Sequence, residues 1–104
     1  MIKVSYYIGT NDKDTLQREL DDISFTKVFD NVFKDYTIQN AISRFTNKNS
    51  QVTLENSFIV TTFIEVHSGE ELKQLALRNC SILKETLNQE SILVEIYKPE
   101  IMFL

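Results

Sequence analysis

Residues 58–88, FIVTTFIEVHSGEELKQLALRNCSILKETLN, contain one sharp change of hydrophobic period, which falls at Ser68. Before Ser68 the apolar side chains alternate along the chain, as in a strand with one buried face. After it they recur at steps of three and four, as on one side of a helix. Ser68 followed by Glu71 matches a capping box, in which a hydroxyl and a carboxylate bond free N–H groups of the first turn. We therefore predict a strand over 52–67 and a helix over 69–88. The buried stripe of this helix is Leu72, Ala76, Cys80, Leu83 and Leu87.

The same two periods divide the rest of the chain. Alternation predicts strands over 2–8, 37–46 and 91–97, and steps of three and four predict a helix over 24–36 with Ser24 as its N-cap. The short, highly charged stretch 15–23 is expected to form a loop with room for one helical turn. Pro99 lacks a donor N–H and ends the last strand, and residues 101–104 are expected to add a short edge strand.

The predicted order is strand, helix, strand, strand, helix, strand in a single domain, residues 1–104. This is the α+β order of a ferredoxin-like α/β-plait, β-α-β-β-α-β. Right-handed crossovers place both helices on one face of a four-stranded antiparallel sheet. A simple meander carrying two helices is the alternative, but it gives two strongly amphipathic helices no common apolar surface to cover.

Composition excludes several classes of protein. Of the 104 residues, 42% are hydrophobic and only three are Gly or Pro, which is unlike a linker or a disordered chain. The 15 acidic and 11 basic residues give a formal charge of −4, which argues against direct binding of nucleic acid. A single Cys forms neither an internal disulfide nor a four-thiolate zinc site. We read no signal peptide and no membrane-spanning stretch, and expect a cytoplasmic protein that does not bind membranes.

The sheet face that the helices leave uncovered is unusually apolar for a surface in water. By the predicted register it carries five large apolar side chains: Tyr7, Ile59, Phe63, Leu93 and Tyr97. Burying one such side chain stabilises by roughly 1.5–3 kcal/mol, so a patch of them favours association. A two-fold homodimer is the simplest form, because one patch can pair with its own copy. Two alternatives stay open: a C-terminal segment that folds over this face, or a register shifted by one residue.

The most acidic stretch is residues 12–22, with five carboxylates against two cations. The carboxylates are Asp12, Asp14, Glu19, Asp21 and Asp22. The stretch opens like a calcium loop but lacks the glycine at the sixth position and the glutamate at the twelfth, so no metal site is predicted. A solvated loop explains it best. As a functional surface, it would suit a protein partner with a basic surface.

Candidate catalytic residues are few. Cys80 falls on a buried helical stripe, where a thiol behaves as a small hydrophobic group, so a Cys–His nucleophilic site is not expected. Glu65 and His67, the only histidine, share the open sheet face and could do acid–base chemistry in a pocket there. More often, a histidine so placed lies at a strand end beside a helix cap. The sequence therefore predicts no catalytic set and no cofactor.

Two short motifs resemble those of a group of small, largely uncharacterised bacterial and mobile-element proteins. Tyr7-Ile8-Gly9 leads into Asn11-Asp12-Lys13-Asp14, like the Tyr-x-Gly strand and polar loop of that group. Gln89-Glu90-Ser91-Ile92-Leu93 is similar to its Gln-Glu-Ser-Val-Leu closing motif. The resemblance implies an α/β-plait and no particular activity. The middle hairpin departs from it, because the hairpin lacks the Gly-rich turn that such proteins often show.

Together these observations favour a non-catalytic protein-interaction module, a small acidic plait that self-associates or binds a protein partner. A sharper form of this hypothesis is an anti-CRISPR-like phage or mobile-element inhibitor of a host nucleic-acid-binding system. The alternative is a small-molecule-binding or enzymatic dimeric α/β-barrel protein with a pocket on the open sheet face. The absence of a recognisable catalytic set makes us favour the first.

Overall fold

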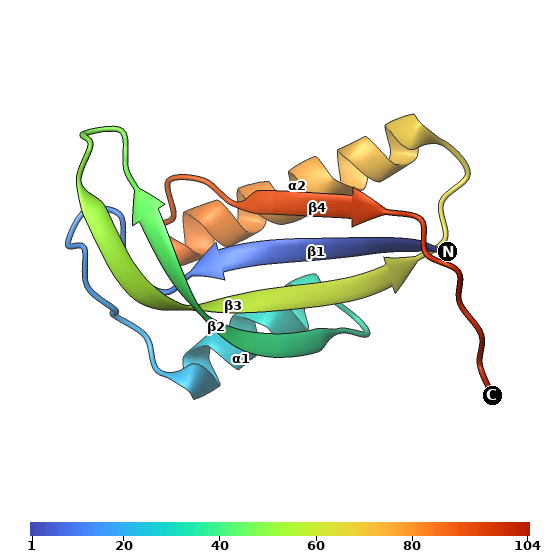
Figure 1. Ribbon diagram of the computed structural model, residues 1–104, viewed down its shortest axis with the longest axis horizontal. Coiled ribbons are helices and arrows are strands. Elements are labelled where there is room, and N and C mark those ends of the chain that lie inside the picture. Colours follow the sequence, from blue (N-terminus) through green and yellow to red (C-terminus); the bar gives the residue numbers. More distant parts are fainter.

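Four antiparallel strands and two helices make up the computed structural model, which describes residues 1–104 (Figure 1). The elements are β1 (Ile2–Gly9), α1 (Asp22–Val32), β2 (Thr37–Thr46), β3 (Val52–Ile64), α2 (Gly69–Leu87) and β4 (Leu93–Tyr97). The strands lie side by side in the order β2-β3-β1-β4. This order and the two crossover helices confirm the ferredoxin-like α/β-plait that the hydrophobic periods predict.

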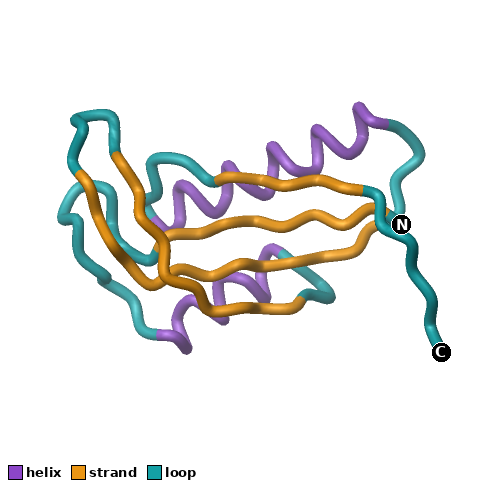
Figure 2. The backbone as a smooth tube through the Cα atoms, in the orientation of Figure 1, coloured by secondary structure: helices purple, strands orange, loops and turns teal.

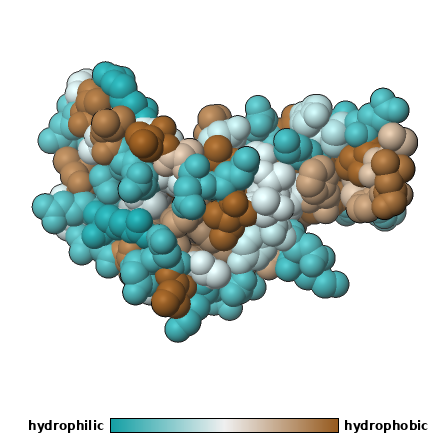
Figure 3. Space-filling view, turned by 60° about the horizontal axis from the view of Figure 1, so that its bottom comes forward, coloured by the Kyte–Doolittle hydropathy of each residue, from teal (hydrophilic) through white to brown (hydrophobic).

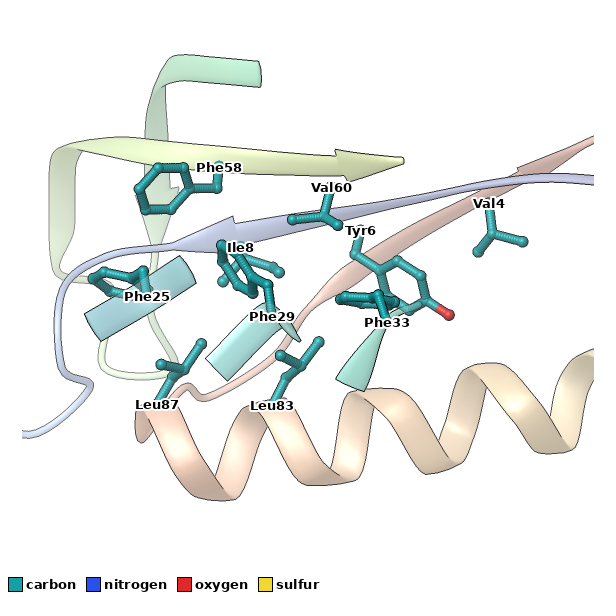
Figure 4. Packing of buried hydrophobic residues seen from close by; sticks show 10 residues of the cluster. All are labelled: Val4, Tyr6, Ile8, Phe25, Phe29, Phe33, Phe58, Val60, Leu83 and Leu87. Atoms are coloured by element: carbon teal, nitrogen blue, oxygen red, sulfur yellow. The ribbon is translucent and has the colours of Figure 1, made fainter. Parts of the chain in front are cut away.

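Both helices pack on the same face of the sheet (Figure 2). Between the layers lies a core of ten buried side chains, drawn in Figure 4: Val4, Tyr6, Ile8, Phe25, Phe29, Phe33, Phe58, Val60, Leu83 and Leu87. Phe29 is fully buried, and its ring meets those of Phe25 and Phe58 at centroid distances of 6.2 and 5.6 Å. The strand residues of this core are those that the alternation predicts for the helix-covered face, so the alternative of a register shifted by one residue is excluded.

The helix ends are fixed by side-chain caps. The Ser68 hydroxyl accepts from the N–H of Glu71, which confirms Ser68 as the cap of α2. The Glu71 carboxylate accepts from the N–H of His67, the residue before the cap, instead of from the N–H of Ser68 itself. The prediction of Ser24 as the cap of α1 is wrong. Asp21 caps that helix, and its carboxylate accepts from the Ser24 N–H at 2.8 Å. An ionised carboxylate is the stronger acceptor for a free N–H group at a helix start.

The predicted edge strand over residues 101–104 is also absent. After β4 the chain runs away from the sheet without pairing, and Met102, Phe103 and Leu104 are exposed (Figure 1). Pro99 removes one donor from this segment, and no neighbouring strand extends beside it. Residues 15–21 form a loop as expected, held by an isolated bridge between Asn11 and Arg18, while Asp22 and Ile23 already belong to α1.

Candidate functional site

The open sheet face has rows of side chains that differ in polarity from one end to the other. The row of Lys3, Phe63 and Tyr97 lies near the N-terminus, and the row of Tyr7, Ile59 and Leu93 lies further along β1. Between them Ser5 and Thr61 share a hydrogen bond of 3.0 Å, and Glu95 accepts from the Tyr7 hydroxyl at 3.1 Å. The five apolar residues predicted for this face therefore lie on it, but a polar row divides them.

Glu55 lies on the same face, beyond the point where β1 ends. Its Oε2 atom accepts from the backbone N–H groups of Thr10, at 2.9 Å, and of Asn11. The side chain is half-buried, and this burial raises the pKa of the Glu55 carboxyl, while the two N–H donors act in the opposite direction. A half-buried carboxylate with a raised pKa beside a cavity is a typical feature of functional sites.

Gly9 is what allows the Glu55 carboxylate to come so close to β1. A Cβ atom at this position would stand 2.9 Å from Glu55 Oε1 and 3.1 Å from Gln89 Oε1. Both distances are shorter than ordinary van der Waals contacts. The glycine of the Tyr-x-Gly motif thus leaves room for a close approach of two side-chain ends, and no turn depends on it, since its φ angle is not positive.

The loop after β1 is fixed to the C-terminal end of α2. Asn88, in the left-handed conformation with φ 49°, donates from Nδ2 to Asp12 Oδ2 and Asp14 Oδ2, both at 2.9 Å. Asp12 Oδ1 accepts from the N–H groups of Asp14 and Thr15. The Asn88 amide and these two N–H groups hold the pKa of Asp12 below its ordinary value. Bonds within the loop and bonds to Asn88 therefore both fix the segment that supplies the N–H donors to Glu55.

A polar pocket opens at this corner, which we call the Glu55 pocket. Its walls are Gly9, Asn11, Asp12, Lys13, Leu16, Phe45, Thr46, Asn47, Thr53, Glu55, Gln89, Glu90 and Ser91. Three carboxylates, those of Asp12, Glu55 and Glu90, face a single cation, Lys13. The space inside measures about 90 Å³, which is enough for a small group but not for a whole nucleoside. The excess of carboxylates favours a ligand with positive charge.

A second, wider groove lies at the other end of the same face. It has a volume of about 1140 Å³ and runs between the C-terminal segment, the N-terminal end of β1 and residues 34–38. Figure 3 shows hydrophobic side chains gathered at the right-hand end of the molecule, where this segment lies. Burial and a hydrogen bond to Asp30 raise the pKa of Tyr36 to about 12. The carboxylates around this groove are all exposed, so it lacks the buried charge that distinguishes the Glu55 pocket.

The five carboxylates predicted to form an acidic surface over residues 12–22 mostly make bonds within the chain. Asp12 lines the Glu55 pocket, Asp14 bonds Asn88, and Glu19 accepts from the Thr15 hydroxyl at 2.7 Å. Asp21 caps α1 and Asp22 pairs with Arg18. Most of these carboxylates hold the loop and the helix start in place.

Glu65 and His67, the predicted residues of an alternative pocket, are both exposed, and none of the pockets described above includes them. Cys80 is half-buried, and burial raises the pKa of its thiol, which opposes a role as nucleophile. No group of three or more His, Cys, Asp or Glu side chains is arranged to hold a metal ion. No helix has the length and apolar character needed to cross a membrane.

Comparison with known proteins adds information about the fold. No family model and no curated protein matches the chain, so the resemblance of its motifs to mobile-element proteins stays a prediction. A phage SAM lyase in complex with S-methyl-5′-thioadenosine superposes with a TM-score of 0.71 and 20% identity, covering 93% of this chain and 80% of that chain. A phage SAM lyase in the apo state gives a TM-score of 0.75 and 21% identity, covering 92% and 78%.

These neighbours overturn the functional hypothesis favoured by the sequence. A non-catalytic interaction module, in the form of an inhibitor of a host nucleic-acid-binding system, is contradicted because the similar solved structures are those of an enzyme. The alternative of a small-molecule-binding or enzymatic protein agrees better with them. The hypothesis depended on the absence of a familiar catalytic motif, and that absence does not exclude an enzyme.

Proposed function

We propose that this protein is an enzyme that binds and cleaves S-adenosylmethionine at the Glu55 pocket. The observation that carries the proposal is the half-buried Glu55 carboxylate, held by the N–H groups of Thr10 and Asn11 in a pocket on the open sheet face. The fold is shared with a phage SAM lyase over more than nine-tenths of the chain.

The charge of the pocket matches the charge of this substrate. S-adenosylmethionine has a sulfonium and an ammonium group against one carboxylate, so its net charge is +1. When its bond from sulfur to Cγ of the amino acid breaks, the electron pair goes to sulfur, and the 5′-methylthioadenosine that leaves is an uncharged thioether. The Glu55 pocket has three carboxylates and one lysine, so it attracts the cationic substrate and binds an uncharged product less well. This difference favours release of 5′-methylthioadenosine after each turnover.

The two oxygens of the Glu55 carboxylate have different roles: one is anchored to the protein, and the other attracts the cationic substrate. One carboxylate oxygen is used to anchor the side chain to the loop after β1, and the other faces the pocket. The two N–H donors keep the carboxylate oriented without neutralising it by an ion pair. A fixed, partly desolvated anion interacts more strongly with a cation than a carboxylate free in water does.

Turnover measured with a matched pair of variants tests the proposal. Purified protein is incubated with S-adenosylmethionine, and the release of 5′-methylthioadenosine is followed by liquid chromatography. We expect release by the wild type and a loss of at least about a hundredfold in Glu55→Gln, which keeps the shape and removes the charge. Glu85→Gln makes the same charge change at an exposed site on α2 and should retain full activity. Wild-type protein that leaves the substrate intact would contradict the proposal.

We further propose that the apolar residues of the open face join two copies of the chain. Phe63, Leu93 and Tyr97 are each about half exposed or more, at 48%, 65% and 52%. Side chains of this size and exposure support association of copies in water. Cytoplasmic location stays a prediction from the sequence.

A further inference from the structure

Two oxygen atoms in the Glu55 pocket have no hydrogen-bond partner within the chain. Glu55 uses only Oε2 for its bonds to Thr10 and Asn11, so Oε1 is free. Gln89 uses only Nε2, which donates to the carbonyl oxygens of Asn11 at 2.8 Å and Leu87 at 3.4 Å, so its Oε1 is also free. Gln89 is only 8% exposed, yet this oxygen is not sealed from solvent. An oxygen that solvent reaches but no donor of the chain does is open to a donor from a ligand.

The orientation of the Gln89 amide follows from its surroundings. Carbonyl oxygens of Asn11 and Leu87 lie on one side of the amide and can only accept. Turning the amide over would place its oxygen against these two acceptors. The Oε1 atom therefore points away from them, toward Gly9.

The two free oxygens converge over the bare Cα of Gly9. Glu55 Oε1 and Gln89 Oε1 lie 2.9 and 3.1 Å from one point, the place that a Cβ on Gly9 would take. A donor seated just outside this point reaches both oxygens. It needs at least two N–H groups, and positive charge favours it because one of the acceptors is a carboxylate.

We propose that Glu55 Oε1 and Gln89 Oε1 together bind a primary ammonium group of the ligand above Gly9. The inference rests on the function proposed above, and it assigns the amino-acid end of S-adenosylmethionine to the enclosed part of the Glu55 pocket. An ammonium group donates three N–H bonds and fits an enclosed space of about 90 Å³. The nucleoside then lies outside, over the row of Tyr7 and Leu93.

Adenine also has an amino group with two N–H bonds, so the experiment must separate the two sources. The probes are S-adenosyl-L-homocysteine, which retains the amino acid on an uncharged sulfur, and the same molecule with hydrogen in place of its α-amino group. Both contain adenine. Their dissociation constants are measured by calorimetry for wild type, Gly9→Ala and Glu55→Gln, and circular dichroism checks that each variant is folded.

The wild type should bind the amino compound at least about tenfold more tightly than its deaminated analogue, since a charge-assisted pair of bonds is lost. Gly9→Ala fills the space between the two oxygens and should remove this preference, with the affinity for the analogue within about twofold of wild type. Glu55→Gln should reduce the preference in the same direction without filling the space, which keeps the test valid if Gly9→Ala does not fold.

Equal affinity of the wild type for the two probes, or equal weakening of both by Gly9→Ala, would overturn the inference. If the wild type still cleaves S-adenosylmethionine, only the ammonium assignment fails and the proposed function stands. If the wild type binds neither probe and leaves S-adenosylmethionine intact, both fail together.

Discussion

The two faces of the sheet are built from alternate residues of the same strands, yet they have different tasks. The helix-covered face contributes Val4, Tyr6, Ile8, Phe58 and Val60, all buried and all packed on helix side chains. The open face contributes Glu55, Ser57, Thr61 and the apolar rows, with hydrogen bonds between strands and exposed rings. The covered face holds the fold together, while the open face has the only half-buried carboxylate with a raised pKa. The buried core and the candidate site thus lie on opposite faces, one residue apart along each strand.

The largest expected difference between the faces is in stability. Phe29→Ala removes a fully buried ring that meets three other aromatic side chains, and should lower the free energy of unfolding by about 3–5 kcal/mol. Phe63→Ala, on the open face, should lower it by about 1 kcal/mol or less. Urea unfolding at low protein concentration measures both. Equal losses would mean that the open face is part of the folding core.

This contrast could be predicted from the sequence, since alternation in residues 2–8 and 52–67 separates the two faces before any coordinates are known. The site could not. Glu55 and Gly9 are 46 positions apart, and only the antiparallel pairing of Gly9 with Ser57 brings them together. One signal was present: Glu55 is the carboxylate that falls among the open-face positions of the second hairpin strand, and a glycine ends the first strand. The register that relates them depends on where each strand ends, which is the least certain part of a sequence-based prediction.

A second difference concerns the loop that serves the open face. Asn88→Gly keeps the left-handed backbone that ends α2 but removes the two bonds to Asp12 and Asp14. We expect turnover to fall about tenfold with little change in melting temperature, because the loop bearing the Thr10 and Asn11 donors is less well fixed. Unchanged turnover would show that the loop holds its position without Asn88.

A third prediction separates the apolar rows of the open face from its polar corner. Phe63→Glu should reduce the solution mass toward the 12.1 kDa of one chain while the helix content stays constant. Analytical ultracentrifugation and circular dichroism measure the two quantities. Wild-type protein that sediments as a monomer at high concentration would contradict the proposed association.

The smallest expected effect is on the pH dependence of stability. The pKa of Glu55 is raised in the folded protein, so its contribution to stability is present below the ordinary value of 4.5 and is lost as the pH rises through the folded pKa. Glu55→Gln should therefore melt slightly higher than wild type at pH 7, and this difference should shrink at pH 4. A variant that melts well below wild type at pH 7 would show that the charge of Glu55 stabilises the fold instead.

The most direct test of the central claim is to locate bound ligand by nuclear magnetic resonance. ¹⁵N-labelled protein is titrated with S-adenosyl-L-homocysteine, and the shifts of backbone amides are recorded. The account predicts the largest changes at Gly9, Asn11, Glu55 and Gln89, around the Glu55 pocket. Changes confined to Phe63, Tyr97 and residues 99–103, or no changes at all at millimolar ligand, would contradict it.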